Sequence, residues 1–251
     1  MRLAFTISSY RLCDFIRLGI LQIRKLCPDA PILISDDRSP ESPFLEAMAG
    51  EFGTSYLCSR VKRSHFGGDA QGIVNALAFA QAAEADVAIK ISQRFILRLP
   101  AVIDVIQKAF YDSNIQFASP GQPKFVRGSK TTMGFGSFAV LSDIVMMRVG
   151  SMRPEDIIET YRRRIERERV PWKDFVESLV HTLHLDTFPG RSIMIPELTD
   201  PAPDPIYLRR YQCQESDFVR LAAEHGFGGR FPCAEWGQIE RGTYRPQVQV
   251  V

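Results

Sequence analysis

Two adjacent carboxylates, Asp36 and Asp37, directly follow the apolar run Pro31–Ser35. An apolar run with β-branched residues predicts a buried strand. Carboxylates at the end of such a strand can accept hydrogen bonds from a base or a ribose, or help to hold a cation. A polar loop with an Asx turn would carry the same pair. Both interpretations stay open from the sequence.

A basic pair lies at the end of another apolar run, Val87–Ile91. Side chains alternate between the two faces of a strand, so we expect Lys90, Ser92 and Arg94 to share one face. Cations inside a sheet must be solvated or paired. A guanidinium can bind phosphate oxygens bidentately and an ammonium adds a point charge, which favours phosphate binding. The alternative is a set of structural ion pairs with Asp36, Asp37 or Asp86.

Two glycines, Gly67 and Gly68, precede the alanine-rich segment from Asp69 to Ala83, which is predicted to be a helix. Glycine lets the backbone approach a ligand closely, and a helix N-terminus favours an anion. The segment matches neither the Walker motif nor the dinucleotide-binding motif. Asp69 as a simple N-cap of the helix is the structural alternative.

A second polar group, made of Asp174, Glu177, His181 and His184, follows at helical spacing. It lies on the face opposite an apolar stripe within residues 172–183. A carboxylate here can act as a general base. Glu177 with the two histidines also has the residue types of a metal site. A solvated helix face explains the same pattern.

These residues are positioned by a regular alternation of predicted strands and helices. Such an alternation predicts an α/β fold in which helices cover both faces of a mostly parallel sheet. Ligands of such sheets bind beyond the carboxyl ends of the strands, where most of the residues above lie. The predicted strands are Leu3–Ser8, Pro31–Ser35, Ser55–Cys58, Val87–Ile91 and Ile115–Ala118.

The second part of the chain has a different pattern. A loop predicted to be mobile runs from Pro120 to Gly136, and strand-like composition returns in Ser137–Val149. A charged helix is expected from Pro154 to Arg169, another from Pro171, and a last short one between Ser216 and Gly226. We therefore expect a ligand-binding domain over residues 1–150. A helical region with a C-terminal tail, over residues 151–251, is expected to pack on the same domain.

Composition excludes several classes of protein. The 251 residues are 45% hydrophobic and 24% charged, which rules out a disordered or fibrous chain. The 31 basic and 29 acidic residues leave a net charge of +2, so no global field favours a nucleic acid or an anionic membrane. No apolar run approaches the roughly 18 residues of a membrane span. Five scattered cysteines are expected to be free thiols, and a soluble, cytoplasmic protein is predicted.

The order of these features resembles that of GT-A type glycosyltransferases, close to the inverting enzymes of family 2. The family's first strand ends in a Pro-Thr-Tyr-Asn-like turn, where this chain has Ile7–Arg11 (ISSYR). The family's second strand ends in Val-Asp-Asp-Gly-Ser, where this chain has Ile34–Ser39 (ISDDRS). A glycine-bearing loop and a small-residue helix then lead to the strand that carries the family's Asp-x-Asp motif. The likeness covers roughly residues 1–150 of the 251.

One departure from the family bears on the chemistry: Ser92-Gln93-Arg94 stands in place of Asp-x-Asp. Those aspartates hold a divalent metal against the nucleotide diphosphate. The resemblance implies sugar transfer from a nucleotide-sugar donor to an unidentified glycan or small-molecule acceptor. Lys90 and Arg94, with the basic loop Lys124–Lys130, would neutralise the diphosphate without Mn²⁺ or Mg²⁺, although such a metal remains open. The alternative is a degenerate module that only binds a nucleotide or a glycan.

The resemblance also implies roles for the candidate residues. Ser8, Tyr10, Asp36 and Asp37 would hold the nucleoside. Asp174 is the first choice for the acceptor's general base and Glu177 the second. A nucleotidyltransferase could use a similar sheet, but the chain lacks a glycine-rich, basic signature near its N-terminus. The remaining residues assigned to nucleotide binding are Gly68, Lys90, Ser92 and Arg94.

Overall fold

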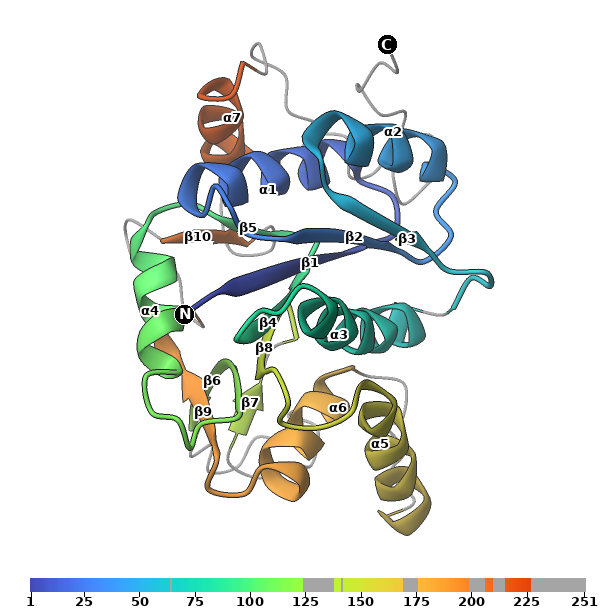
Figure 1. The fold of residues 1–251 in the computed structure, drawn as a ribbon, viewed down its shortest axis with the longest axis vertical. Helices are drawn as coiled ribbons and strands as arrows, with labels where there is room; N and C mark the ends of the chain where they lie inside the picture. The colour runs from blue at the N-terminus through green and yellow to red at the C-terminus, as the bar shows by residue number, and fades with distance from the viewer. Residues whose placement is uncertain are drawn as a thin grey trace.

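The computed structural model describes residues 1–63, 65–123, 138–140, 142–168, 176–198, 206–209 and 215–226. An eight-stranded sheet with the order β3-β2-β1-β4-β8-β6-β7 forms its centre, and β9 pairs with β6 beside that path (Figure 1). Strands β1 to β4 are mutually parallel, and β8 runs antiparallel to both β4 and β6. The strands are β1 (Leu3–Ser9), β2 (Ile32–Asp36), β3 (Ser55–Cys58), β4 (Val87–Ser92), β6 (Phe117–Pro123), β7 (Phe138–Val140), β8 (Ile144–Arg148) and β9 (Ser192–Ile195).

Helices cover both faces of this sheet (Figure 1). Helices α1 (Cys13–Leu26), α2 (Ser42–Phe52) and α4 (Ala101–Ala109) share one buried cluster with alternate residues of β1 and β4. Helices α3 (His65–Ala82), α5 (Pro154–Glu168) and α6 (Val176–Thr182) share a second cluster with the intervening residues. Strand alternation therefore turns one apolar row to each helical layer.

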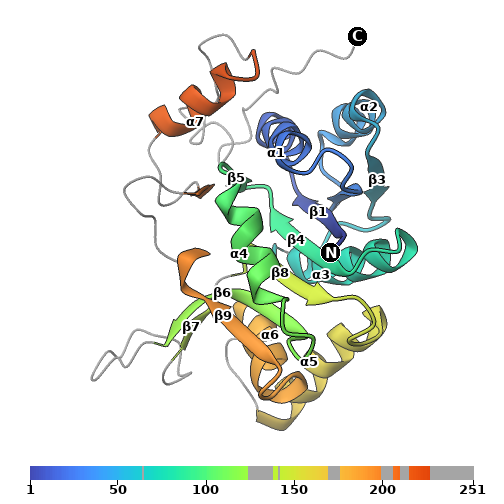
Figure 2. The ribbon, with the colours of Figure 1, turned by 60° about the vertical axis from the view of Figure 1, so that its left-hand side comes forward.

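The C-terminal part adds further elements to this core. A π-helical turn, Leu183–Thr187, extends α6, and a 3₁₀ turn, Pro196–Leu198, follows β9. Strand β10 (Tyr207–Arg209) pairs antiparallel with β5 (Phe95–Leu97) outside the main sheet. Helix α7 (Glu215–Ala223) packs on α1, close to β5 and β10 in Figure 2. Its contact with α1 includes Phe218 against Phe15, with ring centroids 5.5 Å apart.

The predicted fold class, an α/β fold with a mostly parallel sheet, is confirmed. Three strands were not predicted: β5, β9 and β10. Residues 151–251, expected to be helical, thus supply two strands as well, and the division near residue 150 stays a prediction. Part of the loop expected from Pro120 belongs to β6, while Lys124–Lys130 and Asp174 lie outside the described residues. Among the described residues, no helix combines the length and apolarity needed to cross a bilayer.

Candidate functional site

The carboxyl ends of β1, β2 and β4 meet at one edge of the sheet and bring most of the predicted residues together. Ser9 pairs with Asp36 across β1 and β2, and Ser8 pairs with Ser92 across β1 and β4. Neighbouring strands lie about 4.8 Å apart, so these side chains are close neighbours. The predicted meeting of the strand ends follows from this register.

The backbone is strained at the same edge. Arg11, Leu12 and Arg38 have positive φ angles of 67°, 65° and 56°. These angles lie in the left-handed region, which residues other than glycine rarely adopt. The first two residues join β1 to α1, and Arg38 follows β2. Within the described residues only Glu84 is a further non-glycine case. Such strain collects at functional sites, where the surrounding structure enforces it.

The carboxylate of Asp36 accepts three hydrogen bonds from the chain itself. It accepts hydrogen bonds from the Ser39 N–H at 3.1 Å, from the Tyr56 hydroxyl at 3.0 Å and from the Ser42 hydroxyl. The residue is only 1% exposed. Asp36 thus anchors the loop between β2 and α2, as in the alternative interpretation of a polar loop with an Asx turn. Its predicted contact with a nucleoside is opposed by this burial, because almost none of its surface is open to a ligand.

Asp37 lies nearer to the surface and holds the loop that follows β3. Both of its carboxylate oxygens accept the Arg63 N–H at 3.1 Å. Burial raises the pKa of Asp37, and the Arg63 bond partly offsets this effect. Gly68 makes room for it, because a Cβ at Gly68 would lie 2.8 Å from Asp37 Oδ2. The predicted pair Asp37 and Gly68 is therefore in contact, at the start of α3.

Tyr10 is fixed by Gln93, a residue that the sequence analysis did not select. The Tyr10 N–H donates to Gln93 Oε1 at 2.7 Å, and Gln93 Nε2 donates to the Tyr10 carbonyl at 3.0 Å. The Lys62 ammonium lies 4.4 Å from the Tyr10 ring centroid, and the Arg11 guanidinium lies 5.4 Å from it. Two cations on one aromatic ring make this corner of the site attractive to an anion.

These two cations belong to a larger group, which we call the cationic rim. Arg38 donates to the Arg60 carbonyl at 3.0 Å, which ties the segment after β2 to the loop after β3. All members except Arg11 are exposed. Three of these cations lie within residues 60–63, a local basic cluster that is visible in the sequence. The overall net charge of +2 does not reveal such a cluster. The members of the cationic rim are Arg11, Arg38, Arg60, Lys62 and Arg63.

Lys90 forms a buried ion pair with Asp69 of α3. Its side chain is 1% exposed, and its ammonium lies 2.7 Å from Asp69 Oδ1 and donates to the Ser142 carbonyl at 2.9 Å. The partners named from the sequence (Asp36, Asp37 and Asp86) were wrong, because α3 begins at His65 and turns Asp69 toward the sheet. Asp69 is therefore not the N-cap. Lys90 and Ser92 alternate with the apolar residues of β4 as predicted, but Arg94, predicted on the same face, lies beyond the strand in the turn before β5.

The hydroxyl of Ser8 is buried without a hydrogen-bond partner among the described residues, and so is that of Ser9. Gly72 of α3 covers Ser8, because a Cβ at Gly72 would clash with Ser8 Oγ. An unpaired buried hydroxyl costs free energy that a ligand's polar atom can recover. The Ser8 hydroxyl is thus unpaired and enclosed by α3 at the predicted nucleoside end, so a ligand reaches it only if α3 shifts at Gly72.

Glu177 lies beside the same edge. Its Oε1 atom accepts the Ser142 hydroxyl at 2.8 Å, so one residue links Glu177 to Lys90. His181 and His184 are buried, each 4% exposed, and the prediction of a solvated face was wrong for them. Within the described part of the chain, no three His, Cys, Asp or Glu side chains are grouped to hold a metal.

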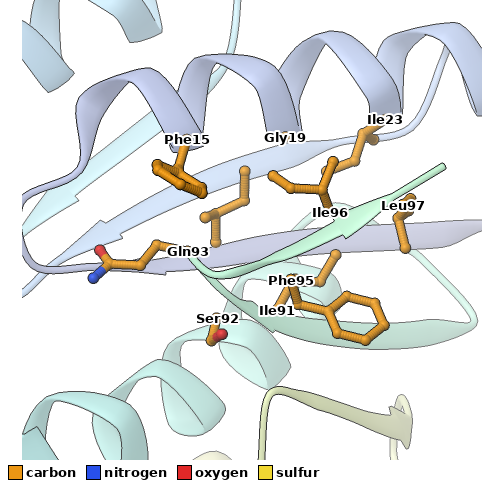
Figure 3. A pocket seen from close by; sticks show the side chains of 10 residues that line it. Phe15, Gly19, Ile23, Ile91, Ser92, Gln93, Phe95, Ile96 and Leu97 are labelled. Atoms are coloured by element: carbon orange, nitrogen blue, oxygen red, sulfur yellow. The ribbon is translucent and has the colours of Figure 1, made fainter. Parts of the chain in front are cut away.

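A small cavity lies between α1 and β5, close to Ser92 and Gln93 (Figure 3). Its volume is about 10 Å³, which is near the minimum for a single water molecule. Apolar side chains line most of it, including Phe15, Ile23 and Leu97. A nucleotide therefore cannot bind inside this cavity, and the edge formed by the strand ends stays the candidate site.

No protein-family model and no curated protein sequence matches the chain. Solved structures do match it. The galactosyltransferase LgtC, in complex with donor and acceptor sugar analogs, matches with a TM-score of 0.54 and 13% identity, over 98% of each chain. A cytidylyltransferase from Leptospira borgpetersenii matches with a TM-score of 0.51 and 13% identity, over 99% of each chain.

A third structure, 4-diphosphocytidyl-2C-methyl-D-erythritol synthase from Anaerococcus prevotii, matches with a TM-score of 0.53 and 8% identity. It covers 90% of this chain and 98% of that chain. Similarity at such low identity shows a common fold. The GT-A-like fold implied by the sequence resemblance is thereby confirmed, and this fold also supports nucleotidyl transfer.

Proposed function

We propose that this protein transfers a sugar from a nucleotide-sugar donor and neutralises the leaving diphosphate with cations of the chain. The observation that carries the proposal is the cationic rim, at the edge where Ser8 has an unpaired hydroxyl. A donor diphosphate carries two negative charges or more, and fixed cations stabilise the charge that develops as it leaves.

Residues at the position of the family's metal motif do not fit a divalent metal. The Ser92 hydroxyl donates to Asp143 at 3.0 Å, the Gln93 amide holds Tyr10, and Arg94 is itself a cation. Mg²⁺ and Mn²⁺ favour oxygen ligands, carboxylates above all. The nearby carboxylate of Asp143 is paired with Arg209 at 3.0 Å. The proposed reaction therefore uses cations of the chain in place of a metal.

The residues take the following roles in the proposed reaction. Ser8 and Tyr10 bind the nucleoside, with Asp37 beside them. Arg94 and the cationic rim bind the diphosphate, while Lys90 holds Asp69 and Ser142 in place. A carboxylate of the helical region takes the proton of the acceptor hydroxyl; Asp174 stays our first choice, and Glu177 is the second. The acceptor oxygen then attacks the anomeric carbon as the bond to the diphosphate breaks, with inversion.

The acceptor is a glycan or a small molecule, and no nucleic acid is involved. Cys13, Cys27 and Cys58 are free thiols, which supports the expected cytoplasmic location.

Calorimetric titration with UDP and GDP, first in EDTA and then in Mn²⁺, tests the proposal. We expect binding that does not depend on the metal and that Arg94→Ala weakens about tenfold to a hundredfold, the usual effect of one charged hydrogen bond. Arg220→Ala is the matched control, since Arg220 is an exposed arginine of α7 paired with Asp217.

Each other outcome corrects a definite part of the proposal. Binding only with Mn²⁺ would overturn the neutralisation by cations. Binding without release of nucleoside diphosphate from UDP- or GDP-sugars would leave a module that binds but does not catalyse. Release of pyrophosphate from CTP would assign a nucleotidyltransferase. No binding under any condition would overturn the nucleotide site itself.

A further inference from the structure

Arg209 of strand β10 is a buried cation with no role in the reaction described above. It is 2% exposed, and its Nη2 atom donates to the Leu198 carbonyl at 3.1 Å. Its guanidinium lies 5.4 Å from the ring centroid of Phe95 and 5.3 Å from that of Tyr207, and these two rings stack on each other. The side chain is therefore held in one orientation, pointing toward β4 and β8.

The ion-pair partner of Arg209 is Asp143, at the start of β8. Arg209 Nε lies 3.0 Å from Asp143 Oδ2, and the other oxygen of Asp143 accepts the Ser92 hydroxyl at 3.0 Å. The Ser92 N–H also donates to the Asp143 carbonyl at 2.6 Å. The Ser92 hydroxyl in turn accepts the Arg94 N–H at 3.3 Å. A continuous series of contacts therefore joins Arg209, through Asp143 and Ser92, to the backbone of Arg94.

The residue before Asp143 extends this series to the acceptor side. Ser142 binds Glu177 through its hydroxyl and Lys90 through its carbonyl, at 2.8 and 2.9 Å. The position of the segment 142–143 thus affects both the diphosphate end of the site and one candidate for the general base. Arg209 holds this segment through charge, because its Nε lies 3.0 Å from the Asp143 carboxylate without the alignment of a hydrogen bond, and a buried ion pair is only weakly screened by solvent.

We propose that Arg209 is a positioning residue: its ion pair with Asp143 orients Ser92 and the turn that carries Arg94 for binding the donor's diphosphate. This inference rests on the proposed function. Arg209 acts through Asp143, because its side chain is buried away from solvent. A segment more than 100 residues beyond β4 in the sequence therefore completes the diphosphate end of the site.

The test compares the affinity for a nucleoside diphosphate with that for its monophosphate. Arg209→Gln, Asp143→Asn and the double variant are titrated with UDP and UMP, or with GDP and GMP if the wild type prefers guanine. We expect each single variant to bind the diphosphate more weakly, by about tenfold or more, because removing one charge of the buried pair leaves the segment 142–143 without its anchor. The affinity for the monophosphate should change less than twofold. The double variant should bind the diphosphate as tightly as the weaker-binding of the two single variants, because both residues act through the same series of contacts.

The matched control is Arg148→Gln. Arg148 is a half-buried arginine that donates to the carbonyls of Ile115 and Phe110, at the opposite end of β8. It should leave the ratio of the two affinities unchanged. Hydrogen exchange gives a second readout: the amide of Arg94 should exchange faster in Arg209→Gln and in Asp143→Asn. Asp143→Asn leaves β10 unaltered, so it tests the path even if Arg209→Gln fails to fold.

Three results would overturn the inference. One is unchanged affinity for both the diphosphate and the monophosphate in folded Asp143→Asn. Another is an equal loss of both affinities, which would assign Arg209 a general structural role. In either case the proposed function survives, since the wild type binds. Failure of the wild type to bind any of the nucleotides would overturn both, and the wild-type titration alone identifies that case.

Discussion

Protonation of His184 should destabilise the folded protein. The residue lies in the π-helical turn after α6, is 4% exposed, and its Nε2 atom lies 2.8 Å from Ser119 Oγ. Its ring meets Phe117 edge-on, with centroids 4.7 Å apart. Burial, with a smaller contribution from His181, lowers the pKa of His184 from 6.5 to about 4. The imidazole is therefore neutral in the folded protein at neutral pH.

The sign of the effect follows from proton binding. Between pH 6.5 and about 4 the unfolded chain binds a proton at His184 that the folded protein does not bind. The free energy of unfolding therefore falls as the pH falls through this range. Each pKa unit is worth about 1.4 kcal/mol, so the whole effect amounts to about 3 kcal/mol. The contribution is fully present above pH 6.5 and is lost near pH 4.

Urea unfolding of the wild type and His184→Gln, at several pH values from about 7.5 to 4, measures this effect. Glutamine places an amide nitrogen near the position of Nε2 and does not titrate. The stability of the wild type should fall by about 3 kcal/mol more than that of the variant over this range, while carboxylate titrations common to both cancel. Parallel curves for the two proteins would refute the argument, whatever their difference in absolute stability.

Three further changes have effects that urea unfolding at pH 7 can measure. Gly19→Ala should stabilise the protein by about 1 kcal/mol, because alanine favours the helix more than glycine does. The added Cβ would contact two isoleucine methyl groups at 3.5 and 3.7 Å, beside the small cavity. A loss of stability would contradict this packing. Gly72→Ala should destabilise by about 2 kcal/mol, since the Cβ would clash with Ser8 Oγ, and a neutral result would mean that α3 lies farther from β1. Lys90→Met should cost about 3 kcal/mol because Asp69 would lose its buried partner, and adding Asp69→Asn should restore part of that loss.

The strands and helices that were predicted correctly are those that a local sequence pattern marks. The runs at Leu3–Ser8, Ser55–Cys58 and Val87–Ile91 are apolar enough to mark strands without knowledge of their neighbours, and the periodicity of α1 marks a helix. Parallel pairing of these strands then follows from the intervening helices. The meeting of Ser8, Asp36 and Ser92 at one edge needed no further information.

The parts that the sequence did not predict depend on contacts between distant segments. Strand β10 is three residues long and exists through its pairing with β5, so no local pattern marks it. Arg209 therefore carried no signal of its own. The partner of Lys90 was missed because α3 begins four residues before Asp69. The two histidines were misplaced because α6 is buried on more than one side and then widens into a π-helical turn.

The late position of β10 in the chain has a consequence for synthesis. When the ribosome has released residues 1–123, strands β1 to β4 and helix α3 can already assemble, and Lys90 has its partner Asp69. Ser142 reaches Lys90 later, and Arg209 reaches Asp143 only when most of the chain has emerged. A nascent chain arrested before residue 206 would therefore carry a folded sheet in which Asp143 lacks its partner Arg209. The Arg209–Asp143 ion pair therefore forms only after residue 209 has been synthesised.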